Sequence, residues 1–272
     1  MKLSKRMEAI AAMVTPGGRL ADIGTDHAYV PIALLERGVV QSAIAMDIRP
    51  GPLARAQKNI AAAGFADRMD TRLSDGLSEL TPGEADTIVI AGMGGMLIKQ
   101  ILSNGREAAH SARELILQPQ SDLTEFRRFL QREGYRILDE DMLCEDGKYY
   151  TVIKAVWKQD TRQTLTAVDS MQEQAGEPDD KQTRMQEAYG PVLLAQKHPT
   201  LKEFLQKEQR QLQKLLEELS GAEIHKSDGE CPESDTDREG LRIEAQERIV
   251  RRRNTLAQRL ECCRQALREL EG

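Results

Sequence analysis

The stretch Arg19–Ile32, RLADIGTDHAYVPI, decides the fold. The residues from Leu20 to Ile23 form a short, mainly apolar run, which is typical of an inner strand in a parallel sheet. Gly24 follows directly, and glycine permits a sharp turn that a side chain would hinder. A helix is expected to begin near Ala28. The stretch therefore predicts a strand, a turn and a helix, the repeating unit of parallel α/β sheets.

The residues of this turn favour a positively charged ligand. Dinucleotide-binding turns place the glycines of G-x-G-x-x-G against a pyrophosphate. Here Gly24 is followed by Thr25, Asp26 and His27, and Asp22 lies just before it. Carboxylates would repel a pyrophosphate but attract an ammonium, and S-adenosylmethionine carries both an ammonium and a sulfonium. The other interpretation is an ordinary strand-to-helix turn in which Asp26 caps the helix.

Length and composition limit the class of protein. The chain has 272 residues, of which 40% are hydrophobic and 30% charged, enough for one catalytic domain and a smaller appendage. Mean hydropathy is −0.52, and no apolar run approaches the roughly 18 residues of a membrane-spanning helix. The amino-terminal segment MKLSKRMEAIAAMV lacks the long apolar core of an export signal. We therefore expect a cytoplasmic protein without membrane association.

Cysteine usage and charge exclude other classes. Cys144, Cys231, Cys262 and Cys263 show no C-x-x-C spacing and have no neighbouring histidine. This pattern predicts neither a metal site nor a disulfide framework. The formal net charge of −6 opposes nucleic-acid binding by the overall field, so such binding would need a local basic face. Nothing in the sequence indicates an obligate protein partner.

A second predicted strand, Ser42–Asp47, ends in an acid. Asp47 stands close to the position, about 20 residues after a cofactor turn, at which a carboxylate commonly binds the ribose hydroxyls. One carboxylate can accept both hydroxyls, which favours an acid here. The other interpretation makes Asp47 a cap for the helix that begins near Pro50.

A third predicted strand, Met69–Leu73, leads into Ser74-Asp75-Gly76. At the carboxyl end of a parallel strand, Asp75 would accept the exocyclic amine of an adenine, and Gly76 would leave room for the ring. A simple polar turn explains this triplet equally well. Acids near three strand ends, at Asp22, Asp47 and Asp75, are less expected by chance than any one of them.

The fourth predicted strand, Thr87–Ala91, runs into Gly92-Met93-Gly94-Gly95 and a helix, Met96–Leu102. Open α/β sheets bind ligands beyond the carboxyl ends of their strands. A glycine-rich turn at this place lets a flat substrate approach the backbone. The other interpretation is a tight turn that only helix packing requires.

The remaining strands complete a Rossmann-like α/β sheet. Glu114–Gln118 is predicted as a fifth strand, and Tyr135–Cys144 and Tyr149–Trp157 flank the turn Glu145-Asp146-Gly147-Lys148. Two strands separated by such a turn predict a hairpin. We therefore expect the sheet to end in an antiparallel edge.

The second half of the chain predicts a helical appendage. We expect a domain over 1–158, a linker or insertion over 159–184, and a helical domain over 185–272 with a flexible connection at 221–240. Alternating three- and four-residue spacings predict two antiparallel coiled-coil helices. The residues of this stripe are Leu201, Leu205, Leu212, Leu215 and Leu219 in the first helix, and Ile249, Leu256, Leu260, Cys263, Leu267 and Leu270 in the second.

A basic cluster lies in the second of these helices. Arg248, Arg251, Arg252 and Arg253 stand close together in the sequence. Most such runs are the solvated face of a helix. The alternative interpretation is a clamp for phosphate groups.

Several segments together resemble a known family. They are LSKRM, LADIGTDHAYVP, AMDIRPGPLARAQKNI, SDGL, IAGMGGMLI, LILQPQSDL and EDGKYYTV. In this combination the chain resembles the bacterial tRNA adenine-22 N1-methyltransferases, class I methyltransferases with a C-terminal coiled coil. The likeness is dense over residues 2–157 and resumes at Tyr189-Gly190-Pro191. DIGTDHAYVP and AGMGGM are its most specific segments.

The resemblance implies S-adenosylmethionine as the cofactor, tRNA as the partner and no metal. It implies Gly24 and Asp26 near the methionine end of the cofactor, Asp47 at the ribose, and Asp75 with Gly76 at the adenine. The expected cofactor-binding residues are Asp22, Gly24, Thr25, Asp26, His27, Asp47, Ile48, Asp75, Gly76, Ala91, Gly92 and Met93. Asp26, Gly92 and Met93 are the catalytic candidates, and Lys2, Lys5, Arg6, Arg248, Arg251 and Arg252 the RNA-binding candidates.

Other functions share parts of this pattern. A methyltransferase for a small molecule or a protein would have the same cofactor turns but no activity on RNA. A non-catalytic RNA-binding or coiled-coil adaptor would keep the helices but would not bind the cofactor. His27 is likewise open to two interpretations, a proton acceptor or a histidine satisfied by local contacts.

Overall fold

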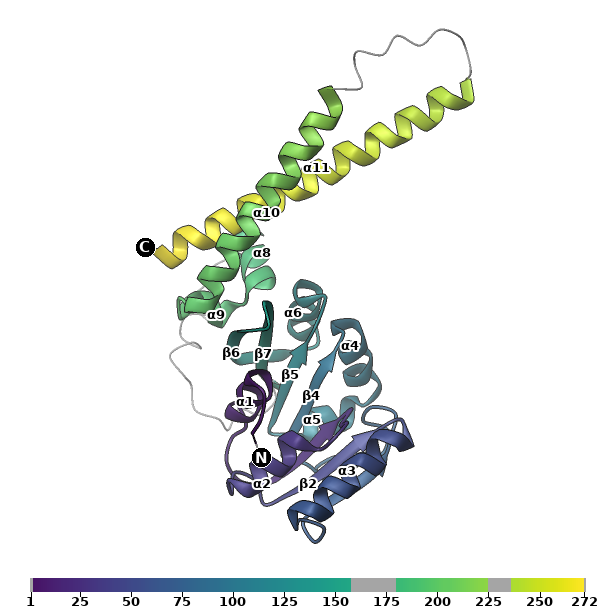
Figure 1. The fold of residues 1–272 in the computed structure, drawn as a ribbon, viewed down its shortest axis with the longest axis vertical. Coiled ribbons are helices and arrows are strands. Elements are labelled where there is room, and N and C mark those ends of the chain that lie inside the picture. The colour runs from purple at the N-terminus through teal and green to yellow at the C-terminus, as the bar shows by residue number, and fades with distance from the viewer. Residues whose placement is uncertain (1, 158–179, 225–235, 272) are drawn as a thin grey trace. The chain divides into compact units, whose positions relative to one another are not determined.

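The chain forms a mixed α/β sheet flanked by helices (Figure 1). The computed structural model describes residues 2–157, 180–224 and 236–271. Within these ranges the seven-stranded sheet has the order β3-β2-β1-β4-β5-β7-β6. Its strands are β1 Arg19–Ile23, β2 Ser42–Asp47, β3 Met69–Leu73, β4 Thr87–Met93, β5 Glu114–Pro119, β6 Tyr135–Glu145 and β7 Lys148–Trp157. β1 to β5 are parallel, and β7 pairs antiparallel with both β5 and β6. The predicted Rossmann-like sheet with an antiparallel edge is confirmed.

Helices cover both faces of the sheet (Figure 1). One face carries α1 Lys5–Ala12, α2 Tyr29–Glu36 and α3 Pro50–Ala63, and the other carries α4 Gly95–Asn104, α5 Arg106–Ser111 and α6 Leu123–Arg132. Successive residues of a strand point to opposite faces. Leu20 of β1 accordingly packs with the first layer, whereas Ala21 and Ile23 pack with the second. Burial on both faces explains why the inner strands β2, β4 and β5 consist largely of apolar residues.

The parallel strands bring their carboxyl ends to one edge of the sheet. Ile23 is paired with Met46 of β2 and with Ile90 of β4, and Asp47 is paired with Leu73 of β3. The turns that follow β1, β2, β3 and β4 therefore emerge side by side. Each of these turns carries candidate cofactor residues.

Helix α1 is fixed to the antiparallel hairpin. Ser4 caps the helix, and its hydroxyl accepts the N–H of Met7 at 3.3 Å. The backbone N–H of Lys5 donates to Glu145 Oε1 at 2.7 Å. At the other end of the helix, Lys154 Nζ donates to the carbonyl of Met13 at 3.0 Å. These contacts define the position of the first turn of α1 on the sheet.

A buried ion pair anchors the segment 186–196 to the sheet domain. Arg127 Nε donates to Glu140 Oε1 at 2.8 Å, and the two side chains are 3% and 0% exposed. Arg127 Nη1 also donates to the carbonyls of Glu187 and Ala188, near the end of α8 Asp180–Tyr189. Glu140 Oε2 accepts the N–H of Val192 in α9 Pro191–Ala195. Removing one partner of such a pair costs about 3–5 kcal/mol, because the other charge stays buried.

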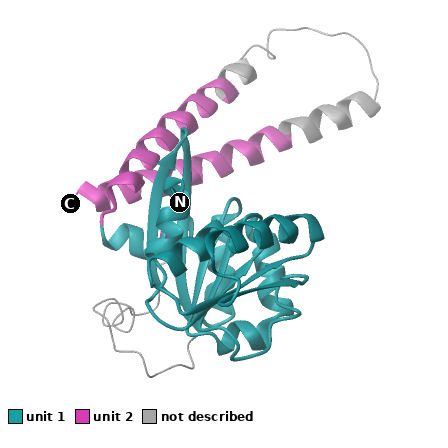
Figure 2. Cartoon of the chain, turned by 60° about the horizontal axis from the view of Figure 1, so that its bottom comes forward, with its two compact units in different colours: residues 1–178, 186–196 teal, residues 179–185, 197–272 magenta. Residues whose placement is uncertain are grey.

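The chain divides into two compact units (Figure 2). Met1–Pro178 and Gln186–Gln196 form the first, and Asp179–Met185 and Lys197–Gly272 form the second. Most of the predicted 159–184 linker lies outside the described residues, as does 225–235 of the predicted 221–240 connection. The two ends of that connection are helical, because α10 Pro199–Ile224 and α11 Thr236–Glu271 extend into it.

Within the second unit, α10 and α11 form an antiparallel pair. Contacts that run in opposite directions along the two helices are Lys202 with Glu271, Leu205 with Cys263, and Glu208 with Arg259. Leu212 continues the series by packing with Leu256 and Leu260. The predicted position of Leu215 in the apolar stripe is wrong. Leu215 is 38% exposed, and Leu216 packs on the cluster instead, because the spacing of four after Leu212 keeps a straight helix on the same face.

Candidate functional site

The turn after β1 curls over the end of β2. The N–H groups of Gly24 and Thr25 both donate to the carbonyl of Met46, at 2.8 and 2.9 Å. Gly24 has a φ of +76°, which an L side chain rarely adopts. Helix α2 begins with Ala28 at its N-cap and without a side-chain cap. The interpretation of Asp26 as the cap of this helix is therefore wrong.

The carboxylates of Asp22 and Asp47 lie close to one another. The pKa of Asp22 is raised to about 6, chiefly because the carboxyl is buried and to a smaller extent because the charge of Asp47 lies nearby. Asp47 is 7% exposed, and its Oδ1 accepts the N–H of Arg49 at 2.7 Å. No hydrogen bond from a described residue reaches its Oδ2, which is left as an acceptor. The cap of α3 is Arg49 and makes no side-chain bond, so Asp47 does not cap that helix.

Asp26 forms an ion pair at the exposed rim of the turn. Arg55 of α3 donates to Asp26 Oδ1 through Nε at 3.0 Å and also through Nη2. This hydrogen bonding lowers the pKa of Asp26. His27 Nε2 lies 3.3 Å from Asp26 Oδ2, and the His27 ring stacks on Tyr29 with centroids 4.9 Å apart. The contacts of His27 are therefore local, as the second interpretation of this residue expects.

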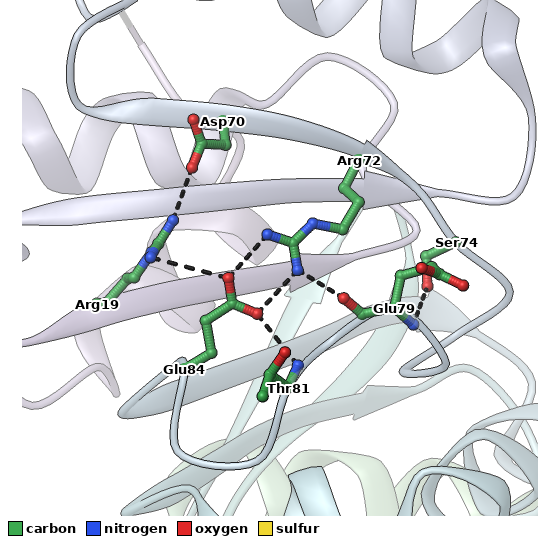
Figure 3. Close-up of polar contacts among 7 residues, drawn as sticks. All are labelled: Arg19, Asp70, Arg72, Ser74, Glu79, Thr81 and Glu84. Carbon is green, nitrogen blue, oxygen red and sulfur yellow. Dashed lines mark hydrogen bonds and ion pairs between the residues drawn. The ribbon is translucent and has the colours of Figure 1, made fainter.

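An ion-pair network holds the loop that follows β3 (Figure 3). Arg72 of β3 donates hydrogen bonds to both carboxylate oxygens of Glu84, each at 2.8 Å. The guanidinium of Arg19 in β1 lies 3.9 Å from Glu84. The hydrogen bonds from Arg72 lower the pKa of Glu84 to about 2. Since Glu84 closes the loop that carries Asp75, the network positions this loop against the sheet.

The predicted adenine triplet lies at the end of β3. The N–H of Ser74 donates to the carbonyl of Asp47 at 2.9 Å, which joins the two strand ends, and Asp75 is exposed. A Cβ at Gly76 would stand 3.0 Å from Ile101 of α4. The glycine here makes room for helix packing, and its role beside an adenine ring remains a prediction.

The glycines after β4 serve different purposes. Gly92 has a φ of +79°, lies in a bulge of the β4–β5 ladder, and donates its N–H to Gln118 Oε1 at 3.1 Å. A Cβ at Gly95 would lie 2.6 Å from the carbonyl of Ser121, so helix packing requires this glycine. Gly92 is exposed, and the nearest atom to a Cβ there is Arg6 Nη1 at 3.3 Å. The packing interpretation therefore holds for Gly95, whereas Gly92 faces the open edge.

The first and fourth turns meet directly. A Cβ at Gly24 would overlap Cε of Met93, so the methionine covers the glycine. Exposed apolar side chains lie near these turns: Ile48 follows β2, Leu73 ends β3, and Met96 and Leu97 lie in the first turn of α4. All four are 49–59% exposed. The edge thus combines carboxylates, apolar surface and an accessible backbone turn.

The candidate RNA-binding residues have different environments. Lys2 and Lys5 are exposed, whereas Arg6 is half-buried beside Gly92. In the second unit, Arg248, Arg251 and Arg252 are exposed, and Arg251 pairs with Glu247 one helical turn away at 3.0 Å. This pairing is typical of a solvated helix face.

Sequence reasoning missed several residues of the site. Arg55 and Asn59 of α3 reach the first turn, where Asn59 donates to the carbonyl of His27 at 3.0 Å. Gln118 binds the fourth turn, and Tyr150 contacts Arg6, which lies beside that turn. The signal available in the sequence was a glutamine at the end of the apolar run Glu114–Gln118, because a buried amide must find hydrogen-bond partners.

The described residues include no group of three or more His, Cys, Asp or Glu side chains that could hold a metal ion. Among the same residues, no helix combines the length and apolar character needed to cross a membrane.

Comparison with known proteins agrees with this geometry. A family model described as a methyltransferase domain matches residues 3–153. The tRNA (adenine(22)-N(1))-methyltransferase of Bacillus subtilis (strain 168) is 41% identical over 155 residues, which cover 57% of this chain and 65% of that protein. A crystal structure of a putative tRNA (m1A22) methyltransferase from Streptococcus pneumoniae matches with 30% identity and a TM-score of 0.74, over 98% of this chain and 100% of that one. This chain belongs to the tRNA (adenine(22)-N(1))-methyltransferase family.

Membership of this family confirms the resemblance seen in the sequence motifs. The match to the Bacillus subtilis relative spans slightly less than two thirds of that protein's length. A second structure of the Streptococcus pneumoniae family member, with 30% identity and a TM-score of 0.72, covers 98% of this chain and 100% of that one. It is a complex with S-adenosyl-L-methionine.

Proposed function

We propose that this chain transfers a methyl group from S-adenosylmethionine to N1 of an adenine in tRNA, at position 22 in the D-arm region. One observation carries the proposal. The acidic ends of β1 and β2 and the glycine turn of β4 converge at one edge of the sheet, with Asp22 beside Asp47 and Met93 on Gly24. The names of the relatives supply the position of the adenine and the class of RNA.

The residues present fit the cofactor. Asp47 offers a carboxylate oxygen at the end of β2, where it would accept ribose hydroxyls. Asp22 and Asp26 place negative charge near the first turn, where an ammonium would be bound. Ile48 and Leu73 present apolar surface suited to an adenine face. When bound, the cofactor supplies an electrophilic methyl group on a sulfonium.

Positioning is the main catalytic demand of this reaction. N1 of adenine carries an in-plane lone pair and no proton at neutral pH, so no base has to remove one. The C–S electron pair stays on sulfur while N1 gains the methyl group and a positive charge. Gly92 opens the edge to the flat ring, and Met93 separates it from the first turn. Alignment of this kind supplies several kcal/mol of barrier reduction, about 7–11 in the best intramolecular cases.

The target base has to leave its stack before it reacts. N1 lies on the Watson–Crick edge, which is inaccessible inside a helix. We propose that the tRNA backbone is bound by Lys2, Lys5 and Arg6 and by the arginines of α11. Affinity should then fall as the salt concentration rises. Because residues 186–196 belong to the first unit, we further propose that the helical domain begins near Lys197 and not at 185. We also propose that the protein acts in the cytoplasm.

One assay tests the proposed function. The protein is incubated with cofactor labelled on its methyl group and with unmodified bulk tRNA, and the modified nucleoside is identified after digestion. We expect labelled 1-methyladenosine. Label in protein or small molecules, with none in RNA, would instead support the other methyltransferase classes.

The role of Asp26 is tested separately. Asp26→Ala should weaken cofactor binding through loss of negative charge at the first turn. An unchanged rate at saturating cofactor would remove Asp26 from the catalytic residues and leave it as a binding residue only.

A further inference from the structure

Arg6 is half-buried at the edge of the sheet formed by the carboxyl ends of the parallel strands, which we call the reaction edge. It lies in the first turn of α1, and its Nη1 donates to Gln118 Oε1 at 3.1 Å. Its guanidinium carbon lies 5.5 Å from the centroid of the Tyr150 ring. Nη1 is also 3.3 Å from the place that a Cβ of Gly92 would occupy. Residues of two strands, β5 and β7, thus hold this guanidinium beside the exposed glycine turn after β4.

Gln118 couples the arginine to the turn. It is fully buried, and its Oε1 accepts from both the N–H of Gly92 and Arg6 Nη1, each at 3.1 Å. Its Nε2 donates to the carbonyl of Pro119 at 3.2 Å. Two donors on one oxygen fix the orientation of the amide. The amide group is therefore occupied, and Gln118 positions Arg6 instead of contacting a substrate.

The guanidinium of Arg6 has N–H donors available to bind an anion. Among the described residues no carboxylate pairs with Arg6, and its one hydrogen bond leaves most of its N–H donors available. Its immediate neighbours are an amide, an aromatic face and a glycine backbone. Lys2 and Lys5, both exposed, add positive charge to the same segment. A fixed and unpaired arginine with this surrounding is suited to a phosphate, which it can bind through two parallel bonds.

The chemistry of the reaction favours phosphate over the base. Methylation gives the adenine ring a positive charge, so a guanidinium against the ring edge would oppose the transition state. The phosphates beside the target adenosine are the anions that accompany the base into the site. On the basis of the proposed function, we propose that Arg6, held by Gln118 and Tyr150, binds a phosphate adjacent to the target adenosine and so seats the extruded nucleotide over Gly92.

The experiment removes one phosphate charge at a time. Unmodified tRNA is prepared with a single neutral methylphosphonate linkage on the 5′ or the 3′ side of adenine 22, and kcat/KM is measured for the wild type and Arg6→Ala. One of the two linkages should reduce the wild-type value by about 10- to 100-fold, the range of a hydrogen bond to a charged group. Arg6→Ala should lose a similar factor on normal tRNA, and the same linkage should then cost it at most about twofold.

Controls separate binding from folding. Arg68 also stands over an aromatic ring, Phe65 at 4.9 Å, but precedes β3 at the opposite edge of the sheet. Arg68→Ala should keep the full sensitivity to the linkage. Arg6→Ala should retain cofactor affinity and thermal stability, and the slope of log affinity against log salt should fall by about 1. Tyr150→Leu, which loosens the guanidinium, should reduce the discrimination between the two tRNAs.

Two results would overturn the inference. One is equal sensitivity of the wild type and Arg6→Ala to both linkages, and the other is a wild type that both linkages leave unaffected. The second result is measured on the wild type alone. The inference therefore stays testable even if Arg6→Ala fails to fold. Absence of any methylation of normal tRNA would overturn the proposed function, and this inference with it, which distinguishes the two failures.

Discussion

The two sides of the sheet edge carry opposite chemistry. On the β1–β2 side, Asp22 and Asp47 bring two carboxylates together. On the β4–β5 side, a buried amide and an arginine surround an exposed glycine. The contact of Met93 with Gly24 joins the two sides. The difference shows how one sheet edge can hold a cationic ligand and a polyanionic substrate within reach of each other.

Matched glycine substitutions on the two sides should give the largest contrast. Gly24 and Gly92 have almost the same φ, +76° and +79°, so alanine introduces similar strain at both. Gly24→Ala should weaken cofactor binding by about 100-fold, because the strained turn also displaces Met93. Gly92→Ala should lower kcat for tRNA while cofactor affinity stays within about threefold. Calorimetric binding and single-turnover rates measure the two effects, and equal loss of cofactor affinity in both variants would refute the division.

The acidic side is tested next by neutralising one carboxylate. Asp47→Asn should weaken cofactor binding by about 30-fold, because a charged acceptor of hydrogen bonds is lost. Asp70→Asn is the control, since Asp70 is an exposed aspartate in β3 that pairs with Arg19 at 2.7 Å. The control should bind the cofactor normally in the same titration. Similar losses in the two variants would contradict a ribose contact for Asp47.

The burial of Asp22, with the charge of Asp47 nearby, predicts a dependence of stability on pH. Folding raises the pKa of Asp22 from 3.8 to about 6, so its contribution to stability is present below about pH 4 and is lost as the pH rises through 6. Relative to Asp22→Asn, the wild type should lose about 1 to 2 kcal/mol between pH 4 and pH 7, allowing for partial exposure of the side chain. Denaturant unfolding of both proteins without cofactor measures this difference.

The same measurement in saturating cofactor sharpens the interpretation. A positively charged ligand favours the ionised carboxylate of Asp22. The decrease in the free energy of unfolding between pH 4 and pH 7 should therefore be smaller with the cofactor bound. A difference between wild type and variant that does not change with pH would show that the Asp22 carboxyl is not perturbed.

The smallest effect is expected from the exposed arginines of α11. Arg251→Gln combined with Arg252→Gln should weaken tRNA binding about two- to fivefold at low salt, because exposed side chains contribute little each. Filter binding at several salt concentrations measures this, with cofactor affinity as the control. A loss larger than that of Arg6→Ala would place the dominant positive charge in the second unit and not at the reaction edge.

Much of the sheet could be predicted from the sequence. The strands Ser42–Asp47 and Met69–Leu73 agree to the residue, because turn residues bound each of them. β4 runs to Met93, two residues beyond the predicted end at Ala91, since Gly92 bulges and pairing with β5 resumes after it. That extension depends on a neighbouring strand, which a local pattern does not contain.

The acidic half of the site could be predicted better than the other half. Each acid lies at the end of its own strand, so the parallel topology alone brings them to one edge. Arg55 and Gln118 act through partners 29 and 26 residues away, Asp26 and Gly92. The helical period predicts which way a side chain points but not which residue it contacts in the folded protein. Pairs of this kind can therefore be identified only from the structure.

The buried pair of Arg127 and Glu140 has a consequence for the history of the family. Because Arg127 and Glu140 are bound to each other and to the backbone of 187–192, a change at one position would leave the other charge buried without its ionic partner. We expect the two positions to co-vary among relatives, with joint replacement by apolar residues tolerated and lone replacement rare. The two residues that attach segment 186–196 to the sheet domain would then be conserved together or replaced together.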